Sequence, residues 1–188
     1  MRKNFGAKPF VYPQPVFIIA SYDEDGVADA MNAAWGCIAD YKKIALYLAS
    51  NHKTMKNILS QKAFTVSIAD VSHVVEADYV GLVSGNDVPD KLTKANLHTM
   101  KSEVVNAPII EEFPMTLECQ FISYDPDSEL LIGEIVNVCA DERILNEKGQ
   151  IDPMKLQPII FDPVHNDYLS IGEKVGNAFQ DGLHLKKP

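Results

Sequence analysis

Residues 50–57 combine the side-chain types that hold anions. The segment reads Ser-Asn-His-Lys-Thr-Met-Lys-Asn, and its first two residues are good helix caps. A helix start offers unpaired backbone N–H groups and the positive end of the helix dipole, which together bind phosphate. An ordinary capped surface helix is the alternative, because capping residues are common at helix starts. The candidate phosphate ligands are Ser50, Asn51, Lys53, Thr54 and Asn57.

A second candidate is the short segment Asn32-Ala33-Ala34-Trp35. Its small side chains let a flat ligand approach the backbone. The N–H groups of Ala33 and Ala34 can then reach the polar edge of an aromatic cofactor. The alternative is a tightly packed strand that carries one core tryptophan.

Two further segments are candidates for ligand contact. The polar stretch from Ser84 to Leu92 is either a surface connection or a binding loop, with Ser84, Asp90 and Lys91 as its candidate side chains. The C-terminal residues 172–188 form either a mobile tail or an arm in which Phe179 covers a ligand.

Other catalytic chemistry has little support in the residue pattern. The five histidines are scattered without the spacing of a metal set, and there is no serine nucleophile elbow or Walker-type phosphate loop. The three cysteines are also scattered and form no disulfide framework, which is typical of a reducing cytoplasm. We therefore predict a cytoplasmic protein without a metal site, and no side chain is assigned as catalytic.

Charge and hydropathy exclude some partners. A formal net charge of −9 disfavours nucleic acid, because a phosphate backbone requires a basic face. No apolar run approaches the roughly 20 residues that cross a bilayer. Prolines interrupt the first 17 residues, so neither a membrane span nor a signal peptide is predicted.

The elements that must position the candidate residues are mostly strands. Apolar or alternating runs predict strands at 16–21, 28–38, 43–49, 64–69, 115–124, 130–140, 158–161 and 168–171. Helical spacing predicts helices at 50–60 and 74–83 and a short turn at 92–100. The pattern is mainly β with inserted helices and favours a closed or nearly closed barrel. Without repeats or composition breaks, residues 1–188 are predicted to be a single domain with an N-terminal extension and a C-terminal arm.

Taken in order, these pieces resemble the flavin reductase-like, flavoredoxin-type family of FMN-binding split-barrel proteins. The resemblance runs from roughly residue 12 to residue 179. It begins at the Pro15-Val16 strand, and Asn32-Ala33-Ala34-Trp35 is similar to the family's Asn-x-Ala segment. Next, Ser50-Asn51-His52-Lys53-Thr54 with Asn57-Ile58 resembles the family's basic-x-Thr-x-x-Asn-Ile phosphate motif. Weaker matches are Asp90-Lys91-Leu92, Ala107-Pro108, Leu117-Glu118-Cys119 and Ile132-Gly133-Glu134-Ile135-Val136.

The resemblance implies a split β-barrel of the Greek-key type that binds FMN. Ser50, Lys53 and Thr54 would hold the FMN phosphate, with Asn57 in support. The segment from Asn32 to Trp35 would line the isoalloxazine ring, and Ser84, Asp90 and Lys91 would lie near the ring or the ribityl chain. The family is typically homodimeric, so the arm around Phe179 would contact the partner's flavin.

Three activities stay open at this point. The chain is an NAD(P)H-dependent flavin reductase-like oxidoreductase, with NADH or NADPH as a transient reductant, or a flavoredoxin-type electron carrier reduced by a protein partner. The third alternative is a non-catalytic split barrel without cofactor. Gly36-Cys37, Tyr41-Lys42-Lys43 and Leu92 depart from the family pattern, which leaves the ring face and the pocket wall in doubt.

Overall fold

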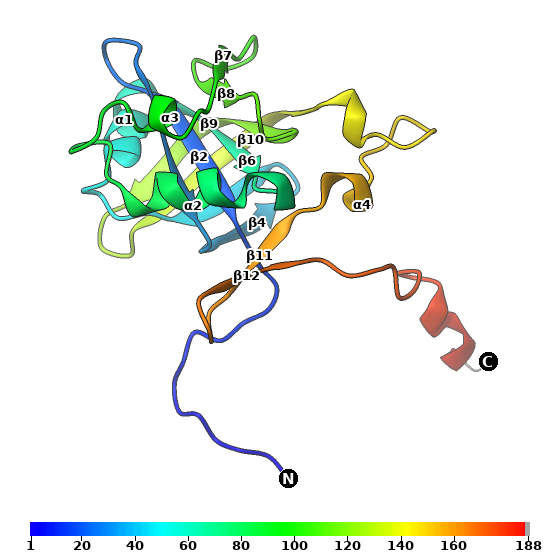
Figure 1. Ribbon diagram of the computed structural model, residues 1–188. Helices are drawn as coiled ribbons and strands as arrows, with labels where there is room; N and C mark the ends of the chain where they lie inside the picture. The colour runs from blue at the N-terminus through cyan, green and yellow to red at the C-terminus, as the bar shows by residue number, and fades with distance from the viewer. Residues whose placement is uncertain (187–188) are drawn as a thin grey trace.

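The computed structural model describes residues 1–186, and its elements are mainly β-strands (Figure 1). In chain order the strands are β1 (Gln14–Pro15), β2 (Phe17–Tyr22), β3 (Ala28–Ala33), β4 (Gly36–Asp40), β5 (Lys43–Tyr47), β6 (Ala63–Ile68), β7 (Thr99–Lys101), β8 (Pro108–Ile110), β9 (Met115–Asp125), β10 (Leu130–Ala140), β11 (Ile159–Asp162) and β12 (Asp167–Ser170). The α-helices are α1 (Lys53–Gln61), α2 (Val74–Leu82), α3 (Lys91–Lys94) and α4 (Pro153–Leu156). Short 3-10 turns are η1 (Val71–His73), η2 (Glu142–Ile144) and η3 (Asp181–Leu185). The predicted mainly β architecture with inserted helices is confirmed.

A seven-stranded antiparallel sheet, in the order β3-β2-β6-β9-β10-β5-β4, forms the body of the fold. Its two edge strands, β3 and β4, follow each other in the chain and are separated only by Ala34 and Trp35. Three Cα–Cα steps span at most roughly 11 Å, so the ends of the edge strands must lie close together. The sheet therefore curls into a barrel that is open along one side.

Two hydrophobic clusters bury the two faces of β2. Phe17 and Ile19 belong to the cluster that also contains Met55 and Ile58 of α1. Ile18 and Ala20 belong to a second cluster, which includes Ala77 and Val80 of α2. Burial on both faces explains why β2 reads as an unbroken apolar run rather than an alternating one. The same arrangement holds α1 and α2 against the sheet.

The largest departure from the predicted elements lies at residues 28–38. This stretch was predicted as one strand, but it is divided into β3, which pairs with β2, and β4, which pairs with β5. Residues 92–100 hold the short helix α3 and the start of β7 rather than one helical turn. The β7–β8 pair is an element that the sequence pattern did not predict.

Both termini leave the barrel, as Figure 1 shows. Residues 1–13 and 172–186 are exposed at every position. Among residues 1–186, no helix has the length and apolar character to cross a bilayer.

Candidate functional site

The edge strand β3 is the element on which three helices converge. Helices α1, α2 and α3 all contact it. Most of the predicted site residues belong to these elements or to the loops that join them. The candidate site therefore lies around β3, at the edge where the barrel is open.

Asp29 of β3 is a buried hub in this region. Its Oδ1 lies 3.1 Å from Lys91 Nζ, and its Oδ2 accepts a hydrogen bond from the Thr54 hydroxyl. Lys91 Nζ also faces the carbonyl oxygens of Val80 and Val83, at 3.4 and 3.3 Å. Burial of a charge is tolerated when it is paired and hydrogen-bonded, as here. The polar groups of Thr54 and Lys91 thus point inward at Asp29, and their predicted contact with a cofactor stays a prediction.

A second ion pair joins α1 to the turn between β2 and β3. Lys53 Nζ lies 3.1 Å from Asp23 Oδ2, and both side chains are about one fifth exposed, at 22% and 19%. Partial burial pushes the pKa of Asp23 up. Hydrogen bonds from the Val27 N–H and Lys53 outweigh this effect and hold that pKa below its ordinary value. The Lys53 ammonium is therefore already partly neutralised in this structure.

The N-terminus of α1 has the features that an anion site needs. Its N-cap is His52, whose side chain makes no capping hydrogen bond. The first turn of a helix leaves N–H groups without partners inside the helix. One turn further on, the side-chain nitrogen Nδ2 of Asn57 is buried and has no hydrogen-bond partner within residues 1–186. Free donors and a buried unpaired amide together fit an oxygen-rich group such as phosphate.

Two hollows adjoin this helix start. A cavity of about 220 Å³ brings together Lys53, Thr54, Ser84 and Lys91. A more open hollow of about 470 Å³ is lined by Lys53 and Asn57 on one side and by the acidic turn 23–25 on the other. Four of the predicted residues thus share one cavity. Ser50 and Asn51 lie in the exposed turn that leads into α1, and Asn86 donates to the Asn51 carbonyl at 3.2 Å.

The predicted ring-binding segment lies beside the C-terminal β11–β12 hairpin. Asn32, Ala33 and Ala34 line a hollow of about 140 Å³ together with Val16, Phe161 and Tyr168. The Asn32 amide donates to the Ala77 carbonyl at 3.0 Å, and Trp35 is 56% exposed. The core position that the alternative required for Trp35 is therefore not observed. An exposed aromatic side chain beside small residues is available to a flat ligand.

Two glycines allow this arrangement. A Cβ on Gly81 would lie 2.2 Å from Asn32 Oδ1, and a Cβ on Gly85 would lie 2.2 Å from Asp29 Oδ1. Both polar side chains of β3 therefore need a glycine opposite them. Any other residue at these two positions would force α2, the loop that follows it or the polar side chains of β3 to shift.

Tyr168 is a site residue that the sequence pattern did not single out. Its hydroxyl donates to Asp78 Oδ1 at 2.8 Å, and burial together with this bond raises its pKa to about 12. Asp29 was missed too, although a carboxylate between two alanines in a predicted strand was a usable signal. A charge in such a position requires a buried partner.

Two predicted residues lie apart from this group. Asp90 is exposed and forms an ion pair with Lys94 at 2.9 Å. This pairing holds the pKa of Asp90 below its ordinary value. Phe179 is 95% exposed. It belongs to the C-terminal segment, which leads away from the barrel in Figure 1. Its predicted contact with a partner's cofactor stays a prediction.

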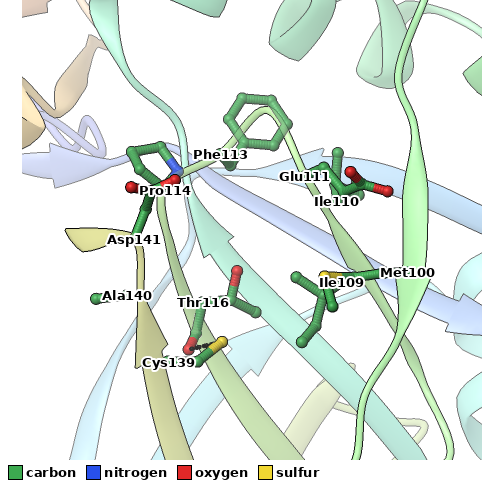
Figure 2. Close-up of a pocket in the computed structure, with 10 residues that line it drawn as sticks. All are labelled: Met100, Ile109, Ile110, Glu111, Phe113, Pro114, Thr116, Cys139, Ala140 and Asp141. Atoms are coloured by element: carbon green, nitrogen blue, oxygen red, sulfur yellow. Dashed lines mark hydrogen bonds between the residues drawn. The ribbon is translucent and has the colours of Figure 1, made fainter. Parts of the chain in front are cut away.

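A further cavity, of about 330 Å³, lies between the β7–β8 hairpin and the adjoining ends of β9 and β10 (Figure 2). None of the predicted cofactor-binding residues lines it. Its lining includes Met100, Ile109, Phe113 and Cys139. This cavity is separate from the candidate site at β3.

Comparison with known proteins relates this geometry to a family. The model of the flavin reductase like domain matches residues 10–158. The structure is similar to flavoredoxin of Desulfovibrio vulgaris (Miyazaki F), with 37% identity, a TM-score of 0.92, and coverage of 97% of this chain and 100% of that chain. It is also similar to flavoredoxin from Methanosarcina acetivorans, with 25% identity, a TM-score of 0.88, and coverage of 98% and 99%. An uncharacterized protein of Aeropyrum pernix is 26% identical over 121 residues, which are 62% of this chain and 46% of that protein.

Proposed function

This chain belongs to the flavin reductase like domain family, and from that premise we propose that it binds FMN and acts as a flavoprotein oxidoreductase. Family membership supports a flavin-related oxidoreductase or electron-transfer role. The single observation that carries the FMN proposal is the uncapped start of α1 beside the unpaired Asn57 amide. The residues present there fit a phosphate group, which FMN has and riboflavin lacks.

In this proposal, the phosphate lies at the N-terminus of α1, held by backbone N–H groups with Ser50, Asn51 and Asn57 in support. Lys53 contributes a positive charge that is shared with Asp23 at 3.1 Å. Thr54 and Lys91 both bind Asp29, and these contacts hold α1 and α3 against β3. Their role is therefore to position the site rather than to contact the phosphate.

The flavin ring lies along Asn32, Ala33, Ala34 and Trp35. Bound FMN supplies the redox chemistry, and the protein orients it and sets the polarity around it. Asn32 is held by the Ala77 carbonyl and backed by Gly81, so its amide presents a fixed dipole. Ser84, which lines the cavity beside Lys53, and Asp90, at the exposed N-cap of α3, complete the proposed set.

A comparison of two ligands tests the phosphate assignment. We expect Asn57→Asp to weaken FMN binding at least tenfold, because it replaces a donor with a carboxylate that repels phosphate. Riboflavin lacks the phosphate, so its affinity should change much less. Fluorescence titration of both ligands on the same variant measures the difference. Equal losses for FMN and riboflavin, or no loss for either, would place the phosphate elsewhere.

We further propose that NADH or NADPH reduces the bound flavin by brief contact with its exposed face. The chain has no glycine fingerprint for a dinucleotide, so the nicotinamide would be held only transiently. Anaerobic mixing of the FMN-loaded protein with each nucleotide should bleach the flavin absorbance within seconds to minutes. Unchanged absorbance with both nucleotides would remove the reductase proposal.

Electron transfer from a protein is the second candidate function, and the formal net charge of −9 favours it. An acidic protein associates faster with a basic partner, and salt slows that association. This role predicts tight FMN, slow reduction by nicotinamides and rapid reduction by a protein donor. A preparation that stays colourless after FMN is added would contradict both functions and favour the non-catalytic alternative.

We also propose that the chain forms a homodimer in which the C-terminal arm reaches the partner. Trp35, Ile38 and Tyr47 expose apolar surface near the open edge of the barrel, at 56%, 62% and 48%. Apolar patches of this kind commonly mark interaction surfaces. Phe179, at 95% exposed, would be covered in the dimer. Analytical ultracentrifugation measures the mass directly.

A further inference from the structure

The cavity between the β7–β8 hairpin and the ends of β9 and β10 is suited to an apolar side chain that has a positive charge next to it. Its volume of about 330 Å³ falls at the lower end of the range for ligand pockets. Met100, Ile109 and Phe113 give it apolar walls. Cys139 also lines it, and its thiol donates to the Thr116 carbonyl at 3.6 Å (Figure 2).

The charge at this cavity is negative. Glu111 and Asp141 line it, whereas no lysine, arginine or histidine does. Asp141 forms an ion pair with Arg143, whose Nε lies 3.4 Å from Asp141 Oδ2. Glu111 is exposed and forms no ion pair within residues 1–186. The cavity therefore disfavours a phosphate-bearing flavin or nucleotide and favours a cation attached to an apolar group.

The C-terminal arm carries such a group. Leu183 and Leu185 are 49% and 76% exposed, and Lys186 follows them directly. The arm has its own local structure: the Asn177 N–H donates to Asp181 Oδ2 at 2.8 Å, and η3 covers Asp181–Leu185. Within residues 1–186, the arm from residue 172 onward makes hydrogen bonds only with itself. The arm therefore contains ordered local structure, and its leucine side chains are exposed to solvent.

We propose that Leu183 and Leu185 of one copy enter this cavity on a second copy, and that Lys186 then lies beside the partner's Glu111. This inference rests on the homodimer proposed above and adds the contact that the arm makes. Residues 172–177 have no helix or turn and span at most roughly 20 Å when extended, which carries η3 away from its own barrel. Two arms and two cavities related by a two-fold axis close the assembly without leaving an arm free.

A disulfide trap tests the contact in the full-length chain. In a Cys37→Ser background, Leu185→Cys is treated with diamide, which takes up the two electrons and two protons released as the new thiol and Cys139 form a bond. We expect a covalent dimer on a non-reducing gel, at least fivefold more abundant than from the matched arm control Val175→Cys. Adding Cys139→Ser should abolish the band.

Three results would overturn the contact: no covalent dimer, an equal yield from Val175→Cys, or a band that survives Cys139→Ser. A disulfide within one chain, found by peptide mapping of the monomer band, would overturn the second copy as the source of the arm. As a charge test, Glu111→Lys should lower the trap yield, and Lys186→Glu should restore it in the double variant. An unchanged yield in Glu111→Lys would contradict the proposed ion pair.

Sedimentation of the wild-type chain separates this inference from the dimer on which it rests. If the wild-type chain has a dimeric mass but Leu185→Cys gives no disulfide-linked dimer, the homodimer is supported and the arm contact is contradicted. A monomeric mass at the trapping concentration removes both.

Discussion

At the scale of single residues, the candidate site depends on a buried carboxylate, Asp29, which is paired with a buried ammonium and a hydroxyl group. Asp29 and Lys91 are 4% and 2% exposed, and their charged atoms lie 3.1 Å apart. Asp90 and Lys94 form a pair of similar length, 2.9 Å, at the surface. Lys91 and Asp90 are neighbours in the chain, but the two ion pairs differ in burial, so their energetic roles should differ as well.

We therefore expect Asp29→Asn to destabilise the fold by about 3–5 kcal/mol, because it leaves the Lys91 ammonium buried without a countercharge. Asp90→Asn is the matched control, and we expect no measurable change from it, since water screens that exposed pair. Urea denaturation followed by far-UV circular dichroism measures both. Overlapping denaturation curves for the two variants would contradict the buried-hub interpretation.

Individual residue roles were only partly predictable from the sequence. Lys53, Thr54, Ser84 and Lys91, which the family resemblance assigns to one cofactor, line the same cavity, and their contact with a cofactor stays a prediction. That Thr54 and Lys91 turn inward could not be predicted, because the pattern does not show which carboxylate lies opposite them. Asp29 reaches Thr54 and Lys91 from a distant strand, and Tyr168 reaches the segment from Asn32 to Ala34 from the C-terminal hairpin. Such partners depend on strand pairing, which a single sequence does not specify.

At the scale of elements, the division between β3 and β4 is the feature that makes the barrel. Residues 28–38 have the small and apolar residues of one strand, and nothing in their composition marks a break. Tertiary pairing imposes it: β3 bonds to β2, β4 bonds to β5, and the Tyr47 N–H donates to the Trp35 carbonyl at 2.9 Å. The strong local signals, such as the Asp23–Gly26 turn and the β9–β10 hairpin, were predictable because their turn chemistry is local.

The β7–β8 hairpin is tied at its base by His98 and Glu112, and this tie should respond to pH. His98 Nδ1 lies 2.7 Å from Glu112 Oε1. The hydrogen bond and charge of Glu112 raise the pKa of His98 above its ordinary 6.5. Burial alone would raise the pKa of Glu112, but the bonds from His98 lower it below its ordinary 4.5.

A raised histidine pKa stabilises the fold below the unfolded value and loses that effect as pH rises through the folded value. A lowered carboxyl pKa does the reverse, so the tie should be strongest between about pH 4.5 and 6.5. We expect Glu112→Gln to return the His98 pKa toward 6.5, and the matched neighbour variant Glu111→Gln to lower it less. NMR titration of the His98 ring measures both. Equal effects of the two variants would mean that distant charge, not the tie, sets the shift.

At the scale of the whole molecule, residues 1–186 contain a curled barrel and two exposed terminal segments. Composition and motif order were enough to predict the mainly β class and the barrel. The courses of residues 1–13 and 172–186 were beyond such reasoning, because segments that are exposed at every position carry no pattern of burial. The hydrogen bond from the Tyr12 hydroxyl to Asp162, which joins the N-terminal segment to β11, has no local signal in the sequence either.

The three cysteines differ in burial, so their reactivity with a thiol reagent measures how far the fold is opened at three depths. Cys37 is exposed, Cys139 is half-buried and Cys119 is fully buried. Burial, with the Glu118 charge as a smaller contribution, raises the pKa of Cys119 to about 12. Because the thiolate is the reactive form, Cys119 should resist labelling twice over, by lack of access and by lack of ionisation.

We expect a thiol reagent such as DTNB to label the native chain in separate phases. Cys37 should react first and Cys139 more slowly, because burial also raises the pKa of Cys139. Cys119 should react only as fast as the chain unfolds, so its labelling rate should rise with urea in step with the loss of circular dichroism. Cys37→Ser should delete the first phase alone. Labelling of Cys119 in the native chain at the rate of Cys139 would show that the barrel opens locally around β9, without global unfolding.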